Sequence, residues 1–177
     1  GVQTCALPIS QGKKMLAIHP IPAFNDNYIW AIINNDAKQA IIVDAGDAAP
    51  VLDFLQKNNL NICQIWVTHH HQDHIGGVAE LANIYPNAQI FAHVDIHPLV
   101  KAKNLQAARE GSELTAWGCP VQVWQVAGHT DNHLAYLLTL EQHLHVFCGD
   151  TLFRAGCGRV FTGTIEQLFE SFERFAE

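Results

Sequence analysis

The stretch QIWVTHHHQDHIGG, residues 64–77, decides the fold. Its first five residues form a compact apolar run that is typical of a buried strand. Four histidines and one aspartate follow within the next six positions, and two glycines then make a turn. A strand that ends in a short polar loop holds these side chains on a rigid base. We therefore expect a functional site at the end of this strand.

The spacing within this cluster predicts which side chains act together. His69 and His71 point the same way in an extended chain, so their two imidazoles can converge on one cation. His70 alternates away from them and is not expected to be a ligand. Asp73 and His74 lie one turn further on, where they can face a second cation next to the first. The other readings of such a run are a solvated polar loop and an expression tag, but a tag does not lie between a buried strand and a helix.

Two later segments repeat the pattern of an apolar run that ends in a polar side chain. They are VAGHT at 126–130 and FCGDT at 147–151, which place His129 and Asp150 at the ends of predicted strands. Loops at one edge of a sheet are where sites are assembled, and a carboxylate can bridge two cations. We therefore expect both residues to join the cluster.

The composition excludes several classes of protein. A length of 177 residues, 49% of them apolar and 15% charged, indicates a globular chain of one domain, or one domain and the start of a second. No apolar run approaches the roughly 18 residues that span a bilayer. The 10 Lys and Arg against 17 Asp and Glu argue against a nucleic-acid partner. The 11 histidines outnumber the Lys and Arg residues together.

The two ends of the chain differ from the rest. Residues 1–14 have neither strand nor helix periodicity and are predicted to be a non-native or disordered extension before Met15; the first ten resemble a translated sequencing adapter. They carry no signal-peptide pattern, so a cytoplasmic protein is expected. Thr164 to Glu177 is predicted to be an amphipathic helix with no capping residue, Gly or Pro to end it, as if the chain were cut there.

The cysteines at 63, 119, 148 and 157 have no metal-finger spacing. They are expected to be reduced, buried thiols.

Short strands and helices alternate along the remainder of the chain. Asp47 is expected to cap a helix through Lys57, and a second helix is expected at 77–85. Residues 95–110 have no clear period, and a helix is the expectation there. Strands are predicted at 28–33, 39–43, 64–68, 89–93, 114–117, 121–126, 133–140 and 143–148. This order predicts an α/β sandwich of two sheets with helices outside.

The motifs together resemble a known family. H-x-H-x-D-H at 69–74, GHT at 128–130 and GDT at 149–151 resemble, in that order, the signature of the metallo-β-lactamase fold superfamily. The wider context is similar to glyoxalase II, the hydroxyacylglutathione hydrolase family, in IPAFNDNYIW at 21–30, IIVDAGD at 41–47 and CGDTLFRAGCGRVFTGT at 148–164. The resemblance extends over residues 15–177 and implies a catalytic domain with an αββα sandwich of two mixed sheets.

The resemblance also implies a role for particular residues. It makes His69, His71 and His129 ligands of a first metal ion, Asp73 and His74 ligands of a second, and Asp150 a bridge between them. Zn is expected, and Fe or Mn also suit such ligands. Arg159, Val160 and Phe161 are implied to contact the glutathione part of the substrate.

The implied reaction is hydrolysis of S-(2-hydroxyacyl)glutathione, such as S-D-lactoylglutathione in methylglyoxal detoxification, to glutathione and a 2-hydroxy acid, D-lactate in that case. Water activated between the metals would attack the thioester carbonyl. Asp73 and Asp150 are the catalytic carboxylates, and Asp73 would orient the nucleophile or accept its proton. A monomer is expected.

Departures from the family pattern leave alternatives open. The Gly-His-Glu-Tyr segment that supplies a further ligand of the second metal is absent, and so is the helical C-terminal domain. Asp131-Asn132 precedes His133 where the family has a Gly, and His133 is interpreted as a strand or supporting residue. The alternatives are a mononuclear-iron persulfide dioxygenase, another hydrolase of this fold, and a catalytically impaired metal-binding fragment.

Overall fold

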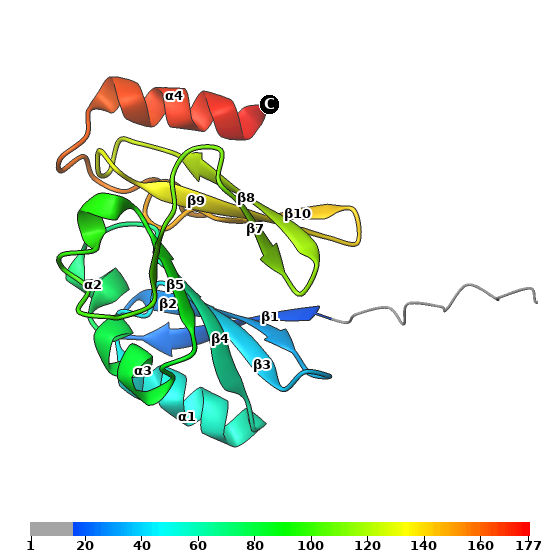
Figure 1. The fold of residues 1–177 in the computed structure, drawn as a ribbon. Coiled ribbons are helices and arrows are strands. Elements are labelled where there is room, and N and C mark those ends of the chain that lie inside the picture. The colour runs from blue at the N-terminus through cyan, green and yellow to red at the C-terminus, as the bar shows by residue number, and fades with distance from the viewer. Residues whose placement is uncertain (1–15) are drawn as a thin grey trace, which may run out of the picture.

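The computed structural model describes residues 16–177, and the extension predicted at 1–14 lies outside them. Two sheets are stacked on each other, with helices on both outer faces (Figure 1). Helices α1 (Ala48–Asn58) and α3 (Val78–Ile84) cover one sheet, and α4 (Ile165–Ala176) covers the other. The predicted α/β sandwich is therefore confirmed. In residues 16–177, no helix is long and apolar enough to cross a membrane.

The larger sheet has six strands in sequence order. They are β1 (Leu16–Ala23), β2 (Asn27–Asn34), β3 (Gln39–Val43), β4 (Asn61–Trp66), β5 (Gln89–Ala92) and β6 (Leu105–Ala107). The first three pair antiparallel, and β3 to β6 pair parallel. Parallel neighbours need a crossover, which α1 and α3 provide. The carboxyl ends of β3 and β4 consequently meet at one edge, where residues 67–77 begin.

The smaller sheet is an antiparallel meander. Its strands lie in the order β10 (His143–Phe147), β9 (Leu134–Leu140), β8 (Cys119–Gln125) and β7 (Glu113–Ala116). Glu141 and Gln142 join β9 to β10, and both have positive φ, 47° and 72°. Such backbone matches the right-handed twist of a two-residue hairpin, which confirms the turn expected there.

The space between the two sheets is filled by apolar side chains from both. Trp66 of β4 stacks on Tyr136 of β9, with ring centroids 5.1 Å apart and planes 17° apart. The Tyr136 hydroxyl lies 2.9 Å from the carbonyl oxygens of Val67 and Phe91. These contacts hold β9 against the end of β4, next to the histidine cluster.

Helix α4 begins with a reciprocal cap. The Thr164 hydroxyl accepts a hydrogen bond from the Gln167 backbone N–H, and the Gln167 side chain accepts one from the Thr164 N–H. The Ser171 hydroxyl donates to the carbonyl of Ala127 at 2.7 Å. The helix is thereby attached to the loop that carries His129.

The structure differs from the sequence expectation in three elements. Strand β1 was not anticipated because Pro20 and Pro22 interrupt its pattern; an edge strand tolerates proline. The helix expected at 95–110 is wrong, since this segment contains a 3-10 turn at Val94–Ile96 and the three-residue edge strand β6. A single-turn helix, α2 (Gln72–Ile75), begins inside the histidine cluster.

Candidate metal centre

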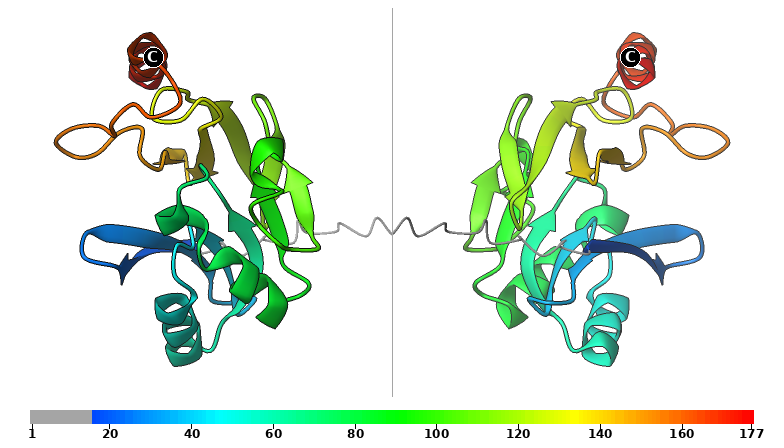
Figure 2. Two further views of the ribbon diagram at one scale, coloured as in Figure 1. Left: turned by 90° about the vertical axis from the view of Figure 1, so that its left-hand side faces the viewer. Right: turned by 90° about the vertical axis from the view of Figure 1, so that its right-hand side faces the viewer.

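The candidate site lies where four strands end. Asp44 follows β3, His69 and His71 follow β4, His129 follows β8, and Asp150 follows β10. Two of these strands belong to the larger sheet and two to the smaller, so the site spans the mouth of the sandwich. Figure 2 shows the β1–β2 hairpin and the loop between β10 and α4 on the same side of the molecule.

His69, His71 and His129, here called the three-histidine group, point their ring nitrogens at one another. His69 Nε2 lies 3.1 Å from His71 Nδ1, and His129 Nε2 lies 3.0 Å from the same atom. The ring of His71 stands nearly perpendicular to the other two, at 80° and 88°. The convergence expected for His69 and His71 is thus observed, and His129, which was expected to join the cluster, lies beside them. Three converging imidazoles are a typical transition-metal donor set.

The protonation of these rings suits cation binding. Burial lowers the pKa of His69, His71 and His129, and charge on neighbouring histidines lowers all three further. The side chains of His69 and His129 are almost fully buried. All three rings are therefore neutral near pH 7, which is the form that ligates a metal.

Asp150 lies between the three-histidine group and His74. Its Oδ2 is 3.5 Å from His129 Nε2, and its Oδ1 is 3.3 Å from His74 Nε2. Asp73 approaches the same His74 nitrogen, with Oδ2 at 3.6 Å. His74 Nε2 is buried without a hydrogen-bond partner in the described part of the chain. A buried nitrogen without a partner, facing two carboxylates, fits a cation beside the first group.

Asp44 is a site residue that sequence reasoning missed. It is buried, its φ is +55°, and its Oδ1 accepts a hydrogen bond from the Thr68 N–H at 2.8 Å. Its Oδ2 accepts one from the Thr68 hydroxyl and lies 3.0 Å from His74 Nδ1. The signal was present, because Asp44 follows an apolar run just as Asp150 does.

Asp44 also affects the charge of His74. Burial opposes a charge on this ring, but without a bound cation the carboxylates of Asp44 and Asp150 outweigh it and raise the pKa of His74 to about 10, so a cation that binds at Nε2 must displace a proton. Asp44, His69 and His74 also offer atoms within 4.8 Å of one another. Since both oxygens of Asp44 already contact Thr68 or His74 Nδ1, we interpret Asp44 as the holder of His74.

The two other nearby histidines have different surroundings. His70 is half-buried, contacts His71 at a ring-centroid distance of 5.0 Å, and belongs to neither candidate donor group. His133 is fully buried and stacks on His69, with centroids 4.5 Å apart and planes 18° apart. Burial lowers the pKa of His133 to about 3. Its packing against His69 agrees with a supporting role.

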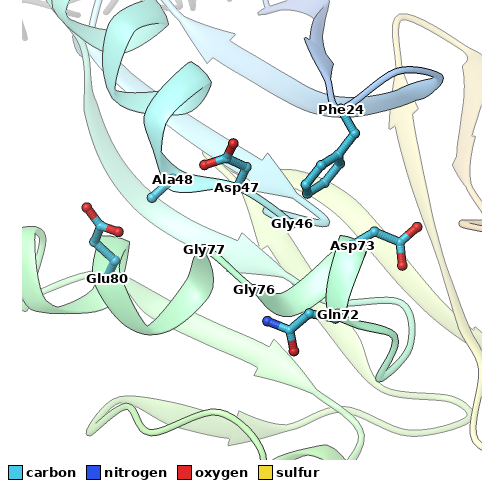
Figure 3. A pocket seen from close by; sticks show the side chains of 9 residues that line it. All are labelled: Phe24, Gly46, Asp47, Ala48, Gln72, Asp73, Gly76, Gly77 and Glu80. Carbon is cyan, nitrogen blue, oxygen red and sulfur yellow. The ribbon is translucent and has the colours of Figure 1, made fainter.

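A groove lies beside the candidate site (Figure 3). Asp73 is at its margin and accepts a hydrogen bond from the Asn27 side chain at 2.8 Å. The groove has a volume of about 430 Å³ and is lined by Phe24, Gly46, Asp47, Ala48, Gln72, Asp73, Gly76, Gly77 and Glu80. Asp73 is the residue that it shares with the candidate donor set.

The predicted substrate contacts lie on the loop before α4. Phe161 is exposed, and its ring centroid lies 4.9 Å from that of His71 and 5.2 Å from that of His129. The side chains of Arg159 and Val160 are exposed on the same loop. One expectation is wrong here: Cys157 is exposed, and Cys63, Cys119 and Cys148 are only half-buried. Cys157 lies on this projecting loop, outside the core.

Comparison with known proteins places the chain in a family. Residues 25–177 match the model of the Metallo-beta-lactamase superfamily. The chain is 46% identical over 160 residues to hydroxyacylglutathione hydrolases of Neisseria meningitidis serogroup A and of Vibrio campbellii, which covers 90% of this chain and 61% and 60% of those proteins. It spans about three fifths of the length of these curated relatives.

The fold comparison agrees. The crystal structure of ETHE1 from Myxococcus xanthus is similar with a TM-score of 0.73 and 26% identity, over 90% of this chain and 68% of that one. The family and the His and Asp groups described above suggest that this chain binds divalent metal ions. The match over residues 25–177, together with the two-sheet sandwich, shows that the chain belongs to the metallo-beta-lactamase superfamily.

Proposed function

We propose that residues 15–177 are the metal-binding catalytic domain of a glyoxalase II, a hydroxyacylglutathione hydrolase. The reaction is hydrolysis of S-(2-hydroxyacyl)glutathione to glutathione and a 2-hydroxy acid, with S-D-lactoylglutathione and D-lactate as the pair in methylglyoxal detoxification. One observation carries the proposal: two donor groups with Asp150 between them occur in a chain 46% identical to proteins named hydroxyacylglutathione hydrolase.

Two divalent ions fit the donors. We assign His69, His71 and His129 to the first ion, Asp73 and His74 to the second, and Asp150 to both. Mixed His and carboxylate ligands suit Zn, the ion proposed first, and also Fe or Mn. Bound there, the ions would supply Lewis-acid activation of water and of the thioester carbonyl.

The chain's own groups prepare this chemistry. The carboxylates of Asp73 and Asp150 offset part of the positive charge that two cations bring. Asp73 is partly exposed and held by Asn27, so it can orient a water molecule or accept its proton at the free carboxylate oxygen. The thiol of the leaving group has a pKa of about 8.5, so departure of the thiolate needs little proton donation.

The loop before α4 supplies the proposed substrate contacts. The Arg159 guanidinium provides charge for a glutathione carboxylate, and Val160 and Phe161 provide an apolar border beside the three-histidine group. A glutathione thioester is the proposed partner. The formal charge of −7 does not favour a nucleic acid. We propose a monomer that acts in the cytoplasm, where reduced cysteines are the norm.

The relatives are longer than this chain, and their remaining length is the proposed source of further contacts. In the described residues, Asp73, His74 and Asp150 surround the second position, one side chain fewer than the family resemblance implies. We propose that a C-terminal helical domain completes the second position and the grip on glutathione. The same observation favours a second candidate, an impaired fragment that binds one ion firmly.

The experiment compares this chain with a longer one that also includes a Gly-His-Glu-Tyr segment and the proposed C-terminal helical domain. Metal content and hydrolysis of S-D-lactoylglutathione are measured on both. We expect one firmly bound ion in the short chain and two in the long one, and His69→Ala or Asp150→Ala should abolish turnover in the long chain. His143→Ala, at an exposed histidine on β10, is the matched control.

Three outcomes contradict the proposal. Normal turnover after His69→Ala or Asp150→Ala removes the assignment of these residues. One iron per chain, with oxygen consumed in the presence of a persulfide, identifies the mononuclear dioxygenase instead. A chain that hydrolyses another ester or an amide but no thioester is a different hydrolase of this fold.

A further inference from the structure

Residues 158–163, here called the lock segment, lie along the loop that carries His129. The Phe161 N–H donates to the carbonyl of His129 at 3.0 Å, and the Gly158 N–H donates to the carbonyl of Asp150 at 2.9 Å. The approach is close, since a Cβ on Gly158 would lie 2.1 Å from the Asp150 oxygen and 2.6 Å from His129 Nδ1. The lock segment therefore touches the backbone of two proposed metal ligands.

The lock segment also sets the state of the His129 ring. His129 Nδ1 lies 2.6 Å from the carbonyl oxygen of Arg159. A carbonyl only accepts hydrogen bonds, so the proton is on Nδ1 and the lone pair is on Nε2. Nε2 is the atom that faces His71 at 3.0 Å. The position of the Arg159 carbonyl consequently determines where the lone pair of His129 points.

A pair of exposed side chains fastens the lock segment. The Thr162 hydroxyl accepts a hydrogen bond from the Asp131 N–H at 3.2 Å and donates one to Asp131 Oδ1 at 3.1 Å. The Thr162 hydroxyl thus makes both contacts to a single residue, Asp131. Thr162 lies three positions after Arg159, and Asp131 lies two positions after His129. Both residues are exposed, so neither is needed to fill the core.

We propose that Asp131 and Thr162 are positioning residues that hold the lock segment on the His129 loop and thereby orient His129 toward a divalent ion. The inference rests on the proposed assignment of His129 as a metal ligand. Because Arg159 and Phe161 lie on the same segment, the pair also connects the proposed glutathione contacts to the three-histidine group.

The test measures Zn²⁺ affinity by competition with a chromophoric chelator, and the visible absorption of the Co²⁺-loaded chain. Thr162→Val keeps the side-chain volume and removes both hydrogen bonds, so we expect about tenfold weaker Zn²⁺ binding and a changed Co²⁺ spectrum. Thr162→Ser should restore both. Asp131→Ala keeps the contact from its own N–H to the hydroxyl, so it should have an intermediate effect.

The matched control is Thr139→Val on an exposed position of β9, which should bind Zn²⁺ like the wild type. Thermal unfolding of each metal-free variant verifies folding; if Thr162→Val does not fold, Asp131→Ala decides. Wild-type Zn²⁺ affinity and a wild-type Co²⁺ spectrum in the folded Thr162→Val or Asp131→Ala chain overturn the inference. A folded Thr162→Ser chain that still binds Zn²⁺ weakly overturns it too.

The outcome is distinguishable from failure of the proposed function. A wild-type chain that binds no Zn²⁺ or Co²⁺ overturns the metal assignment and this inference together. A chain that follows the expected affinity pattern but hydrolyses no thioester contradicts only the proposed function.

Discussion

The Nδ1 of His74 lies 3.0 Å from Oδ2 of Asp44, a residue 30 positions earlier in the chain. The same carboxylate accepts hydrogen bonds from the N–H and the hydroxyl of Thr68. Because a carboxylate only accepts, it holds the proton of His74 on Nδ1 and directs Nε2 toward Asp150. One buried residue thus links the ends of β3 and β4 to α2.

Asp44→Asn should weaken both the fold and the metal site. The amide cannot accept on both sides, so one of the buried groups of Thr68 or His74 loses its partner, at a cost of about 2 kcal/mol in the free energy of unfolding. Urea denaturation and Zn²⁺ titration measure the two effects. Asp36→Asn, in the exposed β2–β3 turn, is the control. Unchanged unfolding and unchanged Zn²⁺ affinity would show that Asp44 has no holding role.

Asn27→Ala should slow the proposed thioester hydrolysis with little loss of stability. The Asn27 side chain donates to Asp73 Oδ2 at 2.8 Å and fixes a carboxylate that is otherwise partly exposed. Loss of such an orienting partner typically costs about tenfold or more in activity or metal affinity. Steady-state kinetics of the longer chain and thermal unfolding are the measurements. Asn25→Ala, in the turn just before β2, serves for comparison, and equal rates in the two variants would contradict the prediction.

Glu110 and Arg174 should make a pH-dependent contribution to the docking of α4. The two guanidinium nitrogens lie 2.8 Å and 2.7 Å from the two carboxylate oxygens, and this hydrogen bonding lowers the pKa of Glu110. A lowered pKa in the folded state adds stability above the ordinary pKa of a Glu, and that stability is lost as pH falls through the lowered value.

We therefore expect Glu110→Gln to reduce stability by roughly 0.5 kcal/mol at neutral pH, because the pair is about half exposed. The difference from the wild type should shrink in acid below about pH 4, where a Glu begins to be protonated. Urea denaturation across this pH range measures it, and Glu113→Gln on β7 controls for the lost charge. A difference that grows in acid would have the wrong sign.

The described cysteines should differ in reactivity toward alkylating reagents at about pH 7.5, since the thiolate is the reactive form. Cys157 is exposed and should react first. Burial raises the pKa of Cys148, and raises that of Cys63 to about 11. Peptide mass spectrometry after timed labelling measures each site, and Cys157→Ser should remove the fast phase at that peptide. Similar rates at Cys63 and Cys157 would contradict the burial argument.

Local signals in the sequence predicted much of the fold. Asp47 caps α1, accepting a hydrogen bond from the Ala49 N–H at 3.0 Å, as the helix-start pattern indicates. The turn at Glu141 and Gln142 also follows from neighbouring residues. Strand β6 was missed because its three residues are too few to show a period, and its pairing with β5 decides its conformation. Asp44 follows an apolar run as Asp150 does, but its contacts with Thr68 and His74 come from the tertiary structure.

By itself, the sequence indicated the proposed metal donors: alternation along an extended chain turns His69 and His71 to one side, and short apolar runs place His129 and Asp150 at strand ends. Only the tertiary structure decided which of these atoms face each other. His71 and His129 are 58 residues apart, and their ring nitrogens come within 3.0 Å because the two sheets pack face to face. Spacing along the chain acts over a few residues, whereas burial of apolar surface between two sheets sets distances across the whole sandwich.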